Sequence, residues 1–165
     1  MLAREFYRIV RRTSLIELCE VLKMTIETNS PGETFDLGVS LGKKAKAGQV
    51  MGLVGELGVG KTIFTQGFAK GLGINEIVNS PTFMIVQEYQ TGRLHFNHFD
   101  VFRIGNIEEL EEIGFDEYLF GEGVTLIEWS NLIVEKMPPK YMKIEIRKDV
   151  NKGFDYRVIT INNNE

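Results

Sequence analysis

The chain has 165 residues, 43% of them apolar, which is enough for one domain with a sizeable core. Its 19 Lys and Arg residues against 23 Asp and Glu residues give a net charge of −4, which argues against a large nucleic-acid surface and against DNA binding. A single cysteine, Cys19, excludes an internal disulfide, and the sequence has no apolar run that could cross a bilayer and no signal peptide. We therefore expect a cytoplasmic protein without membrane contact.

The first 23 residues differ in composition from the rest of the chain. Four arginines alternate there with apolar residues at roughly helical spacing. Such a basic amphipathic segment is typical of a helix on a membrane or a partner, but also of a helix packed on its own domain or of an extension ahead of a true start at Met24. These alternatives stay open, and we expect residues 24–165 to form a single domain.

Strands and helices alternate along the rest of the chain. Runs rich in β-branched and aromatic residues predict strands at residues 24–28, 50–54, 83–89, 94–99, 124–127, 141–147 and 155–161. Composition and end signals predict helices at residues 33–46, 62–72 and 107–113. The third and fourth strands, and the last two, surround glycine-containing turns and therefore predict two hairpins. This order indicates an α/β fold.

Residues 55–62, GELGVGKT, match the phosphate-loop pattern GxxxxGK[ST] between a predicted buried strand and a predicted helix, which is the setting that the pattern requires. The three glycines, Gly55 included, allow backbone angles that turn amide N–H groups toward an anion, and the helix start adds free donors. The lysine would reach the β- and γ-phosphates, and the threonine hydroxyl would bind Mg²⁺. We expect nucleotide contacts from Gly58, Val59, Gly60, Lys61, Thr62 and Ile63.

Two acids follow predicted strands, where an open α/β sheet places groups that contact a ligand. Asp100 is a candidate for holding Mg²⁺ through water or for orienting the attacking water; the alternatives are a helix cap near residue 107 and an ion pair with Arg103. Glu128 follows a uniformly apolar strand, as the acid of the second nucleotide motif does, and is a candidate magnesium ligand or water-activating base. Its alternatives are a helix cap and a paired surface acid.

Three further polar or aromatic features lie close to these acids in the sequence. Thr82, in the segment that begins at Ser80, is either a switch residue that senses the γ-phosphate or the start of a strand. His95 and His98 lie three residues apart and so point to opposite faces of a strand, which argues against a zinc site. Trp129 is a candidate for the core, for a nucleotide wall or for an interface.

Four motifs together resemble the TsaE (YjeE) family of bacterial ATPases, which take part in making threonylcarbamoyladenosine on tRNA. The matching segments are residues 55–62, 80–83, 98–103 and 127–129, in order and at suitable spacing. The resemblance spans nearly everything from about residue 33 to the last hairpin. It implies a P-loop NTPase fold, with a mixed central sheet whose parallel nucleotide-binding core is flanked by antiparallel strands and helices. Phe102 stands where the family usually has a tyrosine.

The resemblance also implies roles for individual residues. Lys61 and Thr62 are then the phosphate and magnesium contacts, Glu128 is the acid on the magnesium side, and Asp100 is an active-site acid. The segment from Ser80 to Thr82 is a switch-like loop.

Two more residues take an expected role from the resemblance alone. Thr34 stands where the family has a threonine near the nucleotide, and Trp129 matches a residue that is important for the assembled activity.

We therefore expect a magnesium-dependent ATPase required for tRNA threonylcarbamoyladenosine modification, whose hydrolysis drives or resets the TsaD-TsaB complex. Outside residues 1–23 the sequence has only four arginines and no evident arginine finger, so we expect weak hydrolysis alone and stimulation by that complex. The alternatives are a small-molecule kinase, which would need a second substrate site and a closing lid, and a nucleotide-regulated binding module. The sequence leaves direct contact with tRNA open.

Overall fold

The computed structural model describes residues 23–164, so the basic segment of residues 1–22 lies outside the described residues. The strands are β1 (Met24–Thr28), β2 (Val50–Val54), β3 (Val86–Tyr89), β4 (Phe96–Asp100), β5 (Val124–Glu128), β6 (Tyr141–Lys148) and β7 (Arg157–Asn164). The helices are α3 (Pro31–Lys44), α4 (Lys61–Gly71), α5 (Glu108–Glu112) and α6 (Phe115–Leu119), with short 3₁₀ turns η1 (Ser130–Leu132) and η2 (Val134–Lys136). Within residues 23–164, no helix combines the length and the apolar character that a membrane span requires.

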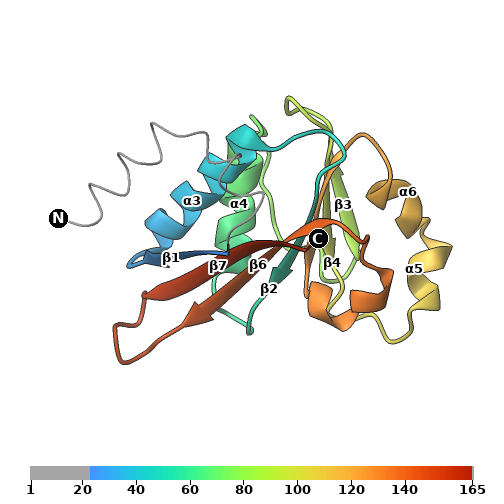
Figure 1. Cartoon of the computed structure of the whole chain (residues 1–165). Coiled ribbons are helices and arrows are strands. Elements are labelled where there is room, and N and C mark those ends of the chain that lie inside the picture. Colours follow the sequence, from blue (N-terminus) through green and yellow to red (C-terminus); the bar gives the residue numbers. More distant parts are fainter. Residues whose placement is uncertain (1–22, 165) are drawn as a thin grey trace.

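The seven strands form one mixed sheet in the order β1-β7-β6-β2-β5-β4-β3, with helices on both faces (Figure 1). The four central strands, β6, β2, β5 and β4, run parallel to one another. The outer pairs β1–β7, β7–β6 and β3–β4 are antiparallel, and the last two pairs are the predicted hairpins. The expected mixed α/β sheet with a parallel centre is therefore confirmed.

Two apolar clusters, one on each face of the sheet, hold the helices in place. The larger one joins the α4 side chains Phe64 and Phe68 to Leu53 on β2 and Phe96 on β4. The other joins strand residues that point the opposite way, such as Phe99, to the α5 and α6 layer. Because side chains alternate along a strand, β4 presents Phe96, His98 and Asp100 to the α4 side of the sheet.

The helix α3 begins and ends at side-chain caps. The Ser30 Oγ accepts from the Glu33 amide at 3.1 Å, which satisfies a free donor of the first turn, and the Glu33 carboxylate accepts from the Asn29 amide, just ahead of the helix, at 2.8 Å. At the other end, Arg93 donates to the carbonyl oxygens of Gly42 and Ala45 at 2.6 and 2.7 Å. Arg93 thus has a structural role, since the last carbonyls of a helix lack partners of their own.

The helices α3 and α4 touch backbone to backbone through glycines. A Cβ atom on Gly67 would lie 2.0 Å from the Phe35 carbonyl oxygen, and one on Gly42 would lie 2.1 Å from the Phe68 carbonyl oxygen. Larger side chains would hold the two helices farther apart. Because α4 starts directly at the glycine-rich loop, this close contact also fixes the direction from which α4 approaches that loop.

The structure corrects the sequence-based prediction in two places. Residues 83–85 are not part of a strand, because the amides of Met84 and Ile85 both donate to the Pro81 carbonyl and close a turn, after which Ile85 has a left-handed φ of 66°. The helix α6 was not predicted. It has five residues and follows Gly114, whose φ is 70°, so it is too short to show a helical period in the sequence.

Candidate functional site

The loop between β2 and α4 has the backbone shape that its motif predicts. Gly58 and Gly60 have φ angles of 72° and 110°, and a Cβ atom on either would meet no atom of residues 23–164 within 4 Å. The backbone angle, and not crowding, therefore requires glycine at these two positions. Thr62 and Ile63 then form the first turn of α4, where N–H groups have no partner within the helix.

Gly55 is needed for a different reason from the one expected. Its φ is not in the left-handed region, but a Cβ atom there would lie 2.6 Å from the Ile146 carbonyl oxygen on β6 and 2.8 Å from Val59 Cγ1. Close approach to the neighbouring strand excludes a side chain. The loop is held on its far side by Arg157 of β7, whose Nε donates to the Val59 carbonyl oxygen at 2.6 Å.

Lys61 is buried at the start of α4, with a relative exposure of 6%. Its Nζ donates to the carbonyl oxygens of Gly55 at 2.8 Å and Glu56 at 3.0 Å, and it lies 3.8 Å from the centre of the Trp129 ring. Burial lowers the pKa of Lys61, and the Glu128 carboxylate, followed by that of Asp100, opposes this shift. The site therefore brings one buried cation close to two acids.

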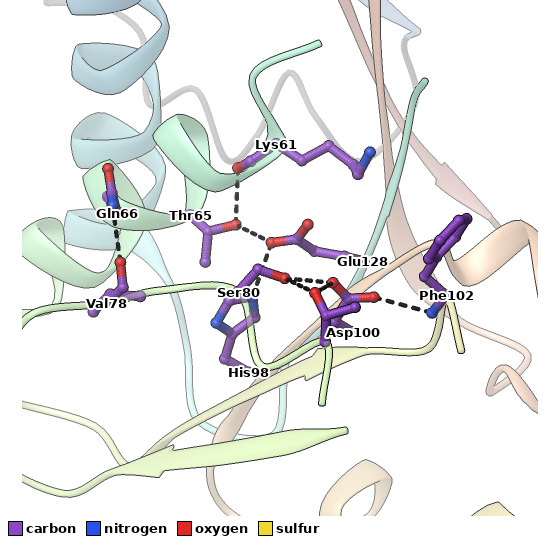
Figure 2. Close-up of polar contacts among 10 residues, drawn as sticks. Lys61, Thr65, Gln66, Val78, Ser80, His98, Asp100, Phe102 and Glu128 are labelled. Atoms are coloured by element: carbon purple, nitrogen blue, oxygen red, sulfur yellow. Dashed lines mark hydrogen bonds and ion pairs between the residues drawn. The ribbon is translucent and has the colours of Figure 1, made fainter. Parts of the chain in front are cut away.

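Glu128 ends β5 beside β2 and β4, opposite Leu53 on one strand and Asp100 on the other. It is 2% exposed, so the alternative of a paired surface acid is wrong. Its Oε1 forms hydrogen bonds with His98 Nε2 at 2.9 Å and Thr65 Oγ1 at 3.3 Å (Figure 2). The carboxylate is thus held from β4 and α4 together.

Asp100 lies at the end of β4 and anchors the segment that follows α4. Its Oδ2 accepts a hydrogen bond from Ser80 Oγ, and its Oδ1 accepts from the Phe102 amide at 3.0 Å (Figure 2). The Oδ2 atom also accepts from Thr82 Oγ1 at 2.7 Å. The alternative pairing with Arg103 is not formed, because that guanidinium group lies over the Phe83 ring. Asp100 therefore joins the Ser80–Thr82 loop to the end of the sheet.

Trp129 lies at the rim of the site and is only partly buried. It takes a left-handed φ of 63°, and its amide donates to the Leu53 carbonyl oxygen at 2.9 Å. The Phe102 ring packs against it with centroids 4.7 Å apart. The aromatic ring at position 102 thus packs against Trp129 without a hydroxyl group.

Thr34 makes its contacts in another part of the fold. It is 2% exposed, and its hydroxyl is 2.8 Å from that of Thr28, across the junction of β1 and α3. The other predicted residues meet at the ends of β2, β4 and β5. A nucleotide contact by Thr34 stays a prediction.

Three side chains of the site were not assigned to it from the sequence. Thr65 lies four residues after Lys61, so helical spacing places both on one face. Its single hydroxyl proton is shared between the Lys61 carbonyl oxygen at 3.0 Å and Glu128 Oε1 at 3.3 Å. His98 lies two residues before Asp100, so the alternation of side chains along a strand places both on the same face of β4, and this spacing could have assigned His98 to the site. Arg157 carries no such signal, because only the tertiary fold brings β7 to the loop.

The sequence of the chain matches one known protein family over most of its length. A model described as Threonylcarbamoyl adenosine biosynthesis protein TsaE matches residues 28–157. The chain belongs to the TsaE family. The resemblance that the four motifs indicated is therefore confirmed.

Two curated TsaE relatives agree with this assignment. A protein of Bacillus subtilis (strain 168) is 47% identical over 133 residues, which are 81% of this chain and 81% of the relative. A protein of Treponema pallidum (strain Nichols) is 37% identical over 124 residues, 75% of this chain and 91% of the relative. Both are named tRNA threonylcarbamoyladenosine biosynthesis protein TsaE.

A solved structure shares the fold of this TsaE-family chain. The crystal structure of Bacillus subtilis YdiB superposes with a TM-score of 0.74 at 41% sequence identity. The match covers 86% of this chain and 85% of that chain.

Proposed function

We propose that this TsaE-family chain is a P-loop NTPase that hydrolyses ATP in tRNA threonylcarbamoyladenosine biosynthesis, and that hydrolysis drives or resets the TsaD-TsaB complex. The left-handed Gly58 and Gly60, directly ahead of α4 and its buried Lys61, are the observation that carries this proposal. The names of the relatives support the pathway. A loop of this shape presents consecutive N–H groups to an anion, and the start of a helix adds partial positive charge.

To bind the triphosphate, Lys61 would have to replace its hydrogen bonds to loop carbonyl oxygens with hydrogen bonds to phosphate oxygens. Its ammonium group now donates to the carbonyl oxygens of Gly55 and Glu56, within the loop itself. Phosphate oxygens carry a full negative charge and so make stronger acceptors than carbonyl groups. Burial already disfavours the charged form of Lys61, and a bound anion would compensate for that cost.

The residues present fit a magnesium ion. Glu128 offers a buried carboxylate and Thr62 a hydroxyl, both of them the hard oxygen ligands that Mg²⁺ prefers. Residues 23–164 contain no group of three or more His, Cys, Asp or Glu side chains that could hold a metal. Few protein ligands suit Mg²⁺, which usually keeps several waters and binds substrate phosphates. When bound, it would neutralise charge on those phosphates.

The two acids would then have separate tasks. Asp100 already accepts hydrogen bonds from Ser80, Thr82 and the Phe102 amide, so both of its oxygens are engaged in holding the loop. Among residues 23–164, both hydrogen bonds to the Glu128 side chain reach Oε1, so Oε2 would be available to the reacting groups. Glu128 would therefore place the attacking water, and the ammonium group of Lys61 would stabilise charge on the γ-phosphoryl group.

Phosphate release from ATP, measured with and without purified TsaD-TsaB complex, tests this function. Wild type should hydrolyse ATP slowly alone and faster with the complex. Glu128→Gln should bind ATP but lose about a hundredfold or more in rate, since a positioned acid-base group contributes about 10²–10⁴-fold. Equal turnover with and without the complex would refute the coupling. ATP binding without turnover under either condition would support a binding module, and transfer of phosphate to a metabolite would support a kinase.

A further inference from the structure

His98 is a buried titratable side chain to which the proposed mechanism has given no task. It is fully buried on β4, between Gln87 of β3 and Leu126 of β5 in the sheet register. Its ring is stacked with that of Phe96, with centroids 5.9 Å apart and planes 8° apart. Sheet neighbours and this aromatic contact fix the ring, so His98 is a rigid support for whatever its nitrogens touch.

The two nitrogens of His98 have different surroundings. Nε2 lies 2.9 Å from Glu128 Oε1, whereas Nδ1 is buried without a hydrogen-bond partner among residues 23–164. A proton on Nδ1 would be a buried donor with no acceptor, which native proteins rarely tolerate. The tautomer in which Nε2 is the acceptor toward Glu128 requires that proton on Nδ1. The arrangement that avoids it has the ring proton on Nε2, which then donates to Glu128 Oε1; Nδ1 is left as an unpaired acceptor, which buried sites tolerate more readily than an unpaired N–H.

This hydrogen bond determines how the Glu128 carboxylate is turned. His98, together with the Thr65 hydroxyl at 3.3 Å, engages Oε1. Figure 2 shows the other carboxylate oxygen directed away from His98 and toward the side on which Lys61 lies. A carboxylate is planar, so holding one oxygen from the sheet also sets where the second one points.

We propose that His98 is a positioning residue, whose Nε2–H holds Oε1 of Glu128 and thereby aims Oε2 at the nucleotide. This role rests on the proposed function, because Glu128 acts there on the reacting groups. His98 would act only through Glu128, the hydrogen-bond partner of its Nε2. Displacing a reacting group by about 1 Å can cost about a hundredfold in rate, so the loss of this support should lower kcat while ATP binding changes little.

A matched pair of variants tests the role. In His98→Gln the side-chain amide nitrogen reaches about the position of Nε2, whereas in His98→Asn it reaches only that of Nδ1. With TsaD-TsaB present, His98→Gln should keep kcat within about threefold of wild type, and His98→Asn should lose about tenfold or more, each with KM for ATP nearly unchanged. Both variants place an amide in the same buried site, so a merely structural role would affect them alike.

The same loss of kcat in both variants, or a loss confined to KM, overturns the positioning role. Adding His98→Asn to Glu128→Gln should cost little further activity, because the support then has no catalytic carboxylate to aim. A full additional loss in the double variant also counts against the proposal. If wild type hydrolyses no ATP with the complex present, the proposed function fails and the role that rests on it fails as well.

A measurement on the wild-type chain requires neither variants nor nucleotide. Long-range ¹H–¹⁵N correlation spectra of labelled protein identify which ring nitrogen of a histidine carries the proton. We expect the proton of His98 on Nε2, with Nδ1 unprotonated. A proton on Nδ1 would overturn the positioning role while leaving the proposed ATPase function untouched, so the two failures can be told apart.

Discussion

Replacing Gly67 by alanine tests how closely α3 and α4 must approach. The added Cβ would lie 2.0 Å from the Phe35 carbonyl oxygen, whereas an ordinary contact is 3.4 Å or longer, so the helix backbones must separate by more than an ångström. The clash is with backbone and not with a flexible side chain, and the contact is similarly close at Gly38, where an added Cβ would lie 2.3 Å from the Phe64 carbonyl oxygen. We therefore take the upper end of the usual overpacking cost, about 3 kcal/mol. Alanine's better helix propensity recovers about 1 kcal/mol.

Gly67→Ala should thus lower the free energy of unfolding by about 2 kcal/mol, which is a shift in Tm of about 4–8 °C for a domain of this size. Urea unfolding followed by circular dichroism measures this change, and the slope m should stay constant. Gly32→Ala is the matched control in the first turn of α3. Its Cβ would meet only Ser30 Oγ, at 3.8 Å, so it should be neutral or slightly stabilising. Equal stability of the two variants would refute the argument from close contact.

Three further predictions concern the site. In the pH range between the lowered pKa of folded Lys61 and its ordinary value of 10.5, the unfolded chain binds more protons than the folded one. The free energy of unfolding of the wild type, relative to that of Lys61→Met, should therefore rise with pH across this range. A difference between the two proteins that does not change with pH in urea unfolding would contradict this. Lys61→Met should also change the fluorescence emission spectrum of Trp129, the only tryptophan of the sequence, because the substitution removes the ammonium group that lies over its ring. Identical spectra of the two proteins would count against this contact. Asp100→Ala removes the hydrogen bonds that hold Ser80 and Thr82, so the loop should become more mobile and chymotrypsin should cleave faster after Phe83, which is already 84% exposed in the wild type. An unchanged cleavage rate would contradict the anchoring role.

Features that depend on residues close to one another in the sequence were predictable from the sequence. The left-handed angles at Gly58 and Gly60 follow from a motif whose backbone shape is the same wherever it binds phosphate, and both hairpins follow from their turns. Placing Glu128 and Asp100 each at the end of a strand was also enough to expect them at one edge of a parallel sheet.

Features that depend on which strands become neighbours were not predictable. The pairing of β4 with β5 brings His98 to Glu128, and no local pattern indicates that pairing. The reason for Gly55 lies in the approach of β6, and the support of the loop by Arg157 lies in the position of β7. Residues 83–85 do not form the predicted strand, because the hydrogen bonds of a turn to the Pro81 carbonyl outweigh the strand preference of their composition.

Calorimetric titration of ATP with Mg²⁺ into the folded wild-type chain, beside Lys61→Ala, tests the central claim most directly. We expect saturable binding at one site in the wild type and a loss of that binding in Lys61→Ala, because the loop that leads into α4 would be the nucleotide site. The absence of binding heat in the wild type at several temperatures, or equal affinity in the two proteins, would contradict it.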